Sequence, residues 1–112
     1  MQDKTVEKMD REIHRLQVEL GSIGPMRPGA VSRQYHKPRE KAGGFWQLSY
    51  TYQQRSHTEN VREDELEAVR SELEEYRKFK ELCARWVELA LARARRNREL
   101  KRQRSDESKG AT

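Results

Sequence analysis

The chain has 112 residues, of which 38% are charged and 33% are hydrophobic. An average soluble domain is about one quarter charged and nearly half apolar, so this composition excludes a large self-contained core and predicts one domain at most. The formal net charge of +5 favours anionic partners over basic ones.

The sequence also indicates the cellular compartment in which the protein is expected. No stretch approaches the roughly 18 consecutive apolar residues that a membrane span needs. The N-terminus alternates charges and lacks the apolar segment of a secretory signal. Cys83 is the single cysteine, which forbids an intramolecular disulfide and fits a reducing compartment. We therefore expect a cytoplasmic protein with no membrane partner.

Residues 1–20 predict an N-terminal amphipathic helix. Its apolar side chains recur at steps of three and four residues, namely Val6, Met9, Ile13, Leu16 and Leu20. Gly21 is a candidate C-cap, and two prolines follow it. A stripe this narrow is stable only against a partner surface, which is either the second helix of this chain or a helix of another copy.

Residues 21–60 predict a small β-sheet with basic, turn-rich loops. The segment AVSRQYH has the β-branched and aromatic mix of a short strand, and FWQLSYTY is the strongest strand pattern of the chain. Its alternation places Trp46, Leu48, Tyr50 and Tyr52 on one face. The polar QQRSHTENV then returns after a turn at residues 53–55, which gives an antiparallel sheet of two or three strands.

Residues 61–104 predict one long helix, because they contain neither Pro nor Gly. Asn60, three residues before Glu63, has the spacing of a capping box. Beyond residue 91 the apolar stripe stops, with Leu100 as an outlier, and we expect residues 105–112 to be disordered. The stripe comprises Leu66, Val69, Leu73, Tyr76, Phe79, Leu82, Trp86 and Leu89.

Together these elements predict an α+β protein: an N-terminal helix, a small antiparallel sheet and a long C-terminal α-helix with coiled-coil-like packing. Burying the apolar stripe contributes less free energy than ordering so long a helix costs. We therefore expect a homo-oligomer whose interface uses the apolar stripes of both helices.

The end of the long helix, RARARRNRELKRQR, is the strongest chemical signal. Guanidinium groups stay charged at neutral pH and bind phosphate oxygens through a planar fork. Two alternatives are a solvated helix end and pairing with an acidic stretch of a partner, such as residues 63–75. The candidate phosphate-binding side chains are Arg93, Arg95, Arg96, Arg98, Lys101, Arg102 and Arg104.

A second basic set lies among aromatic residues of the turn-rich segment. Basic side chains interleaved with aromatic rings can grip phosphates and stack on bases. The alternative, which we favour for Trp46 and its strand neighbours, is that the rings form the core face of the sheet. The basic side chains are Arg27, Arg33, His36, Lys37, Arg39 and Lys41.

The sequence contains no residue pattern typical of a metal site or of a catalytic site. His14, His36 and His57 lie in three separate segments, and Cys83, which neighbours the apolar stripe, is interpreted as a small core residue. There is no glycine-rich phosphate loop or nucleophile elbow. We expect no metal, no cofactor and no enzymatic activity.

The order GAVSRQY, GGFWQLSYTY and ENVREDELEAVRSELEEYRKFKELCARWVEL resembles a family of short uncharacterised prokaryotic proteins often found near transposase and other mobile-element genes. The resemblance covers roughly residues 21–92. Many members carry a cysteine cluster in the segment equivalent to residues 35–44, which here reads YHKPREKAGG and has no cysteine. The resemblance implies an accessory protein of a mobile genetic element and transfers no catalytic residue.

The sequence therefore favours a non-catalytic nucleic-acid-binding accessory protein that contacts phosphates through the Arg-rich helix end, with DNA favoured over RNA. The alternative is an oligomeric structural or adaptor protein that docks onto a protein partner, such as a transposase, a recombinase or a phage component.

Overall fold

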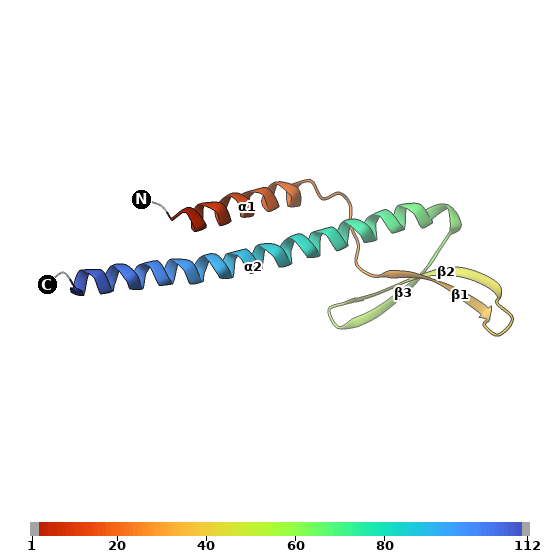
Figure 1. Cartoon of the computed structure of the whole chain (residues 1–112). Helices are drawn as coiled ribbons and strands as arrows, with labels where there is room; N and C mark the ends of the chain where they lie inside the picture. The colour runs from red at the N-terminus through yellow and green to blue at the C-terminus, as the bar shows by residue number, and fades with distance from the viewer. Residues whose placement is uncertain (1–2, 111–112) are drawn as a thin grey trace. The chain divides into compact units, whose positions relative to one another are not determined.

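The computed structural model describes residues 3–110 and confirms the α+β class. The described residues fall into two compact units: residues 3–22 join residues 80–110 in one unit, and residues 23–79 form the other. The elements, shown in Figure 1, are α1 (Lys4–Gly21), β1 (Ala30–Lys37), β2 (Ala42–Tyr52), β3 (Arg55–Val61), the short 3-10 helix η1 (Glu63–Glu65) and α2 (Leu66–Gly110).

Helix α1 begins at a capping residue that the sequence analysis did not single out. The Asp3 carboxylate accepts a hydrogen bond from the Val6 backbone N–H at 3.1 Å, which satisfies one of the free donors of the first turn. At the other end Gly21 belongs to the last turn, and Ser22 caps the helix by donating from its backbone N–H and its hydroxyl to the Glu19 carbonyl.

The three strands form one antiparallel sheet in the order β1-β2-β3, with β2 at its centre. Leu48 pairs with Val31 on one side and with Glu59 on the other, so these residues share a face. Gln53 and Gln54 make the β2–β3 turn, and both have positive φ angles, as a two-residue type I′ hairpin turn requires.

The core of the sheet unit lies between the sheet and the first turns of α2. Leu48 is only 1% exposed and packs with Val61 and Val69, and half-buried neighbours surround them. This confirms the predicted core face for Trp46, Leu48 and Tyr50. Tyr52 occupies the same face of β2 but is 60% exposed, because it lies at the end of the strand.

Two consecutive glycines make room on both faces of the β1–β2 hairpin. A Cβ on Gly43, whose φ is +67°, would lie 3.0 Å from Cδ2 of His36. A Cβ on Gly44 would lie 2.5 Å from the guanidinium of Arg33, on the opposite face. Glycine at both positions therefore allows a side chain of β1 to lie across β2 on each side of the sheet.

The predicted start of the long helix is wrong. Asn60 pairs with Gln47 inside β3 and caps nothing. The helical segment instead starts after Arg62, whose backbone N–H donates to the Glu65 carboxylate at 3.3 Å. Its end also differs, because α2 continues through residues 105–110, which carry no helix breaker before Gly110, and residues 111–112 lie outside the described part.

The apolar stripes are covered within this one chain. Leu66, Val69 and Leu73 pack on the sheet, while Leu16 and Leu89 are buried in the helical unit. None of the other residues predicted to form an oligomer interface is exposed: Val6, Met9, Ile13, Leu20, Tyr76, Phe79, Leu82 and Trp86 are all half-buried. Each of the half-buried side chains keeps part of its surface exposed, and a homo-oligomer interface through these stripes stays a prediction.

Candidate nucleic-acid interface

The basic end of α2 lies in the helical unit, where α1 runs antiparallel to it (Figure 1). Ion pairs mark the alignment of the two helices. Glu12 accepts from Arg85 at 2.9 Å, Asp10 accepts from Arg93, and Asp3 accepts from Arg96 at 3.0 Å. The residue numbers of the carboxylates decrease along α1 as those of the arginines increase along α2. The start of α1 therefore lies beside Arg96.

These ion pairs hold the two arginines in place. The Arg96 guanidinium and then the Val6 N–H lower the pKa of Asp3 below its usual range. Asp10 raises the pKa of Arg93, and Asp3, followed by Glu99, raises that of Arg96. Both guanidinium groups already have carboxylate partners, so a phosphate would have to displace a carboxylate to bind them.

The other five basic side chains of the run are exposed and form no ion pair with any residue in the described range 3–110. Arg95, Arg98 and Arg102 follow each other at positions i, i+3 and i+7, so they share one face of the helix. Lys101 lies at the edge of that face, whereas Arg104 follows Leu100 by four residues and lies nearer the side of Arg93 and Arg96. We call these five residues the outer basic set.

Two large apolar side chains precede the outer basic set. Val87 is 59% exposed and Leu91 is 55% exposed, and Arg95 follows Leu91 at the same four-residue step. The face of α2 that turns away from the ion pairs therefore carries a short apolar segment followed by a basic one. Such a face suits either a polyanion or a protein partner.

The members of the second basic set differ in their contacts, and two of them, Arg27 and Arg33, already contact other side chains. Arg27 lies between two carboxylates, 3.6 Å from Glu59 and 3.5 Å from Glu72. Arg33 lies over the ring of Trp46, with its guanidinium carbon 5.1 Å from the ring centroid. A phosphate would have to displace a carboxylate from Arg27, whereas the Arg33 guanidinium uses its face for the stack on Trp46.

Trp46 is also engaged and is not a free stacking surface. A second guanidinium, that of Arg70, lies 5.1 Å from its ring centroid, and its indole N–H donates to the Glu63 carboxylate at 3.1 Å. These contacts and its packing against the core support the interpretation of Trp46 as a structural residue.

Lys37, Arg39 and Lys41 remain exposed at the β1–β2 turn, and Glu40 is the one acidic side chain among them. No ion pair joins any of these three cations to another residue of the described range. This basic turn is therefore the part of the second basic set that stays available.

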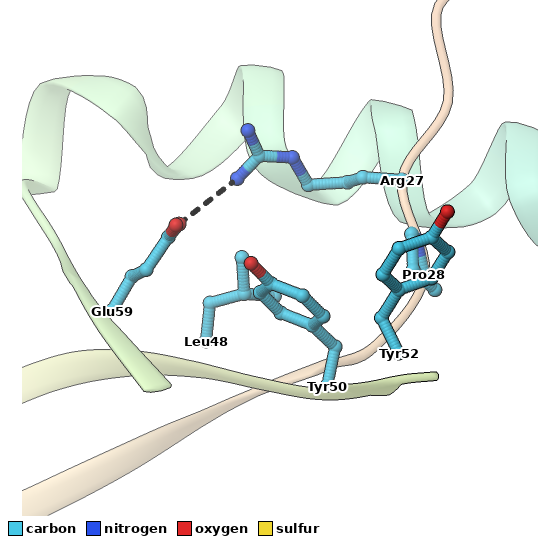
Figure 2. A pocket seen from close by; sticks show the side chains of 6 residues that line it. All are labelled: Arg27, Pro28, Leu48, Tyr50, Tyr52 and Glu59. Atoms are coloured by element: carbon cyan, nitrogen blue, oxygen red, sulfur yellow. Dashed lines mark ion pairs between the residues drawn. The ribbon is translucent and has the colours of Figure 1, made fainter. Parts of the chain in front are cut away.

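A small cavity lies in the sheet unit beside the Arg27–Glu59 ion pair (Figure 2). The rings of Tyr50 and Tyr52 stand side by side in it, and Leu48 and Pro28 complete its walls. Its volume of about 210 Å³ is below the roughly 300–1,000 Å³ of small-molecule sites. We assign it no ligand.

Within residues 3–110, no three His, Cys, Asp or Glu side chains gather closely enough to hold a metal ion. His57 stacks on Tyr50 with ring centroids 4.9 Å apart, and Cys83 is half-buried. No described helix is long and apolar enough to cross a membrane.

The sequence analysis missed the acidic side chains that pair with the basic run. Asp3, Asp10 and Glu12 flank the apolar stripe of α1 at the positions where helix pairs usually carry interhelical ion pairs. That spacing was visible in the sequence and could have identified them. Comparison with known proteins adds no relative, because no family model, curated protein or solved structure matches the chain.

Proposed function

We propose that this chain is a non-catalytic nucleic-acid-binding protein that contacts phosphates through the outer basic set of α2. The observation that carries the proposal is the separation of the basic run by helix face. Arg93 and Arg96 pair with carboxylates of α1, whereas Arg95, Arg98 and Arg102 face away from them and all five residues of the outer basic set are exposed with no described carboxylate partner.

This arrangement suits a polyanion. Exposed guanidinium groups lose little hydration before they meet a phosphate, and each contact releases counterions from the nucleic acid. The ion pairs with α1 fix the helix, so the outer side chains extend from a defined surface. The binding surface is therefore smaller than the sequence predicted, because Arg93, Arg96, Arg27 and Arg33 serve the fold.

A charge-removal experiment tests the proposal. Arg95, Arg98 and Arg102 are replaced together by Gln, and the Kd for a short DNA duplex is measured by fluorescence anisotropy between 50 and 200 mM salt. Five phosphate contacts predict a salt slope near −4.5, so the affinity of the native chain falls roughly 500-fold over this range. The triple variant keeps two phosphate contacts, so its salt slope is near −1.8 and its affinity falls roughly 12-fold over the same range.

Helix α1 supplies a matched control. Lys8, Arg11 and Arg15 are exposed, have the same i, i+3, i+7 spacing and belong to the same unit. Changing them to Gln removes the same charge from an acid-rich helix and should leave the slope nearly unchanged. An equal loss in both triple variants would show that only the net charge matters, and this would refute the assignment to α2.

DNA is favoured over RNA as the partner, and association with a mobile genetic element stays a hypothesis that rests on the sequence resemblance. Comparing duplex DNA, single-stranded DNA and structured RNA in the same assay tests the first point.

The second candidate function is an adaptor that docks onto a protein such as a recombinase. The exposed Val87 and Leu91 favour it, because burying aliphatic side chains drives protein association rather than phosphate binding. Light scattering separates the two: defined oligomers or complexes that do not respond to added DNA or RNA favour the adaptor. A homo-oligomer formed through this face is compatible with either function.

A further inference from the structure

One face of the sheet carries no Asp, Glu, Lys or Arg in any of the three described strands. The register places the charged side chains of the strands on the face that α2 covers, among them Arg33 and Glu59. The opposite face, which we call the outer sheet face, carries mainly hydroxyl and amide groups. Examples are Ser32, Gln34, Gln47, Ser49, Thr58 and Asn60.

This distribution is the reverse of what solvation alone favours. In a chain that is 38% charged, the exposed face of an antiparallel sheet should carry many of the charges. Charged groups are costly to remove from water, whereas hydroxyl and amide groups can exchange water for other hydrogen-bonding partners. The outer sheet face therefore has the composition of a surface that a polar, hydrogen-bonding partner covers.

An aromatic pair lies on this face. The rings of Phe45, on the central strand, and His36, on β1, have centroids 4.7 Å apart and an interplanar angle of 29°. Gly43 leaves room for the imidazole, since a Cβ there would lie 3.1 Å from Cβ of His36. Planar rings on an open sheet surface are the groups on which unpaired bases stack.

The basic turn adjoins the aromatic pair. Lys37 follows His36 but belongs to the other face of the sheet, while the turn that carries Arg39 and Lys41 joins His36 and Lys37 at the end of β1 to the start of β2, three residues before Phe45. Phosphates next to a stacked base would thus meet cations at this end of the sheet. The turn complements the charge of the backbone, while the amide and hydroxyl groups complement the edges of the bases.

We propose that the outer sheet face, with the His36–Phe45 pair and the basic turn, binds unpaired bases of single-stranded nucleic acid. The proposal rests on the proposed function and extends it from phosphates to bases. A second copy of the chain is the less favoured occupant, because the aromatic pair is the main apolar feature of this face and polar groups give self-association little driving force.

The test compares two probes and two matched variants. The probes are a 12-nucleotide thymidine oligomer and a 12-base-pair duplex, both followed by fluorescence anisotropy. Phe45→Leu removes the ring and keeps an aliphatic side chain, and it should weaken binding of the oligomer roughly 5- to 150-fold, the range for one base–aromatic stack. Duplex binding should change less than twofold, because the outer basic set supplies it.

Tyr52→Leu is the control, since Tyr52 is an exposed aromatic residue of the same strand on the other face. It should leave both affinities unchanged. Far-UV circular dichroism verifies the fold of each variant. A second measurement needs no variant: adding the oligomer to the ¹⁵N-labelled native chain should shift the side-chain amide signals of Gln34 and Gln47.

The outcomes separate this inference from the proposed function. Duplex binding with unchanged oligomer affinity in Phe45→Leu, or with unmoved glutamine signals, would overturn this inference alone. No binding of either probe would overturn both proposals. A concentration-dependent dimer that Phe45→Leu dissociates, with oligomer affinity unchanged, would assign the face to a second copy instead.

Discussion

Leu48 is the side chain whose removal should most damage the sheet unit. It is 1% exposed and lies between Val61 of β3 and Val69 of α2. Its neighbours belong to two strands and a helix, so they cannot all move inward to fill a space left at this position.

Leu48→Ala should therefore cost about 2–5 kcal/mol in the free energy of unfolding, the usual range for such a truncation in a core. A unit formed by residues 23–79 is expected to have a total stability of about 3–9 kcal/mol. The substitution should thus remove at least about one fifth of that stability and, at the upper end of its cost, more than half. A unit this small has an m value near the low end of about 1–3 kcal/mol/M, so the urea midpoint should fall by roughly 2 M or more.

Each unit contains one tryptophan, which allows the sheet unit to be followed by itself. In a Trp86→Phe background, the emission of Trp46 reports on the sheet unit. Met26→Ala is the control, because it truncates a side chain of similar size that belongs to the same unit and is 42% exposed. It should change stability by less than about 0.5 kcal/mol. A loss below about 1 kcal/mol for Leu48→Ala, or equal losses in both variants, would refute this account of the core.

Three further substitutions test the turns and the helix pair. Replacing Gln53 and Gln54 by Asn-Gly should stabilise the chain by about 0.4–1 kcal/mol in urea unfolding, because both positions have positive φ angles that Asn and Gly adopt readily. Gly43→Ala should destabilise it by about 1 kcal/mol in the same assay, because φ is +67° and the new Cβ meets the neighbouring imidazole. Asp3 has a pKa below its ordinary 3.8 in the fold, so its stabilising effect is complete above that value and is lost as the pH falls through the lower folded pKa. Asp3→Asn should reduce this acid-induced loss of helix, measured by circular dichroism from pH 5 to 2, and an unchanged acid transition would refute the role of the Arg96 ion pair.

The existence of the elements was predictable because each has a strong local pattern. The alternation along FWQLSYTY predicted β2 and its core face, and the absence of Pro and Gly predicted one long helix. The start of that helix was not predictable from capping patterns alone. Asn60 had the right spacing, but its pairing with Gln47 extends β3 and moves the helical start beyond Arg62. Tertiary pairing here outweighed a local preference.

The division into two units was hidden for a different reason. The residues that meet in the helical unit are far apart in the sequence, as the pairs Asp3–Arg96 and Glu12–Arg85 show. A stripe of apolar residues indicates which face of a helix is buried, but it does not identify the surface that covers that face. The sequence analysis left open whether α1 packs on its own chain or on another copy, and the ion pairs answer this for the described chain.

The periodicity of the helix determines which arginines of α2 pair with α1 and which stay exposed. The contact face of α2 toward α1 does not stop where the apolar residues stop, because the steps of four and three residues continue through charged positions to a last half-buried leucine. Arg93 and Arg96 occupy positions of this series, so they meet α1 and are paired, and Leu100 is the next position of the same series and is half-buried. Arg95, Arg98 and Arg102 are out of phase with these positions and stay exposed. The same periodicity that packs the helices therefore selects which cations remain for a polyanion. The buried and half-buried positions of this series are Leu82, Trp86, Leu89, Arg93, Arg96 and Leu100.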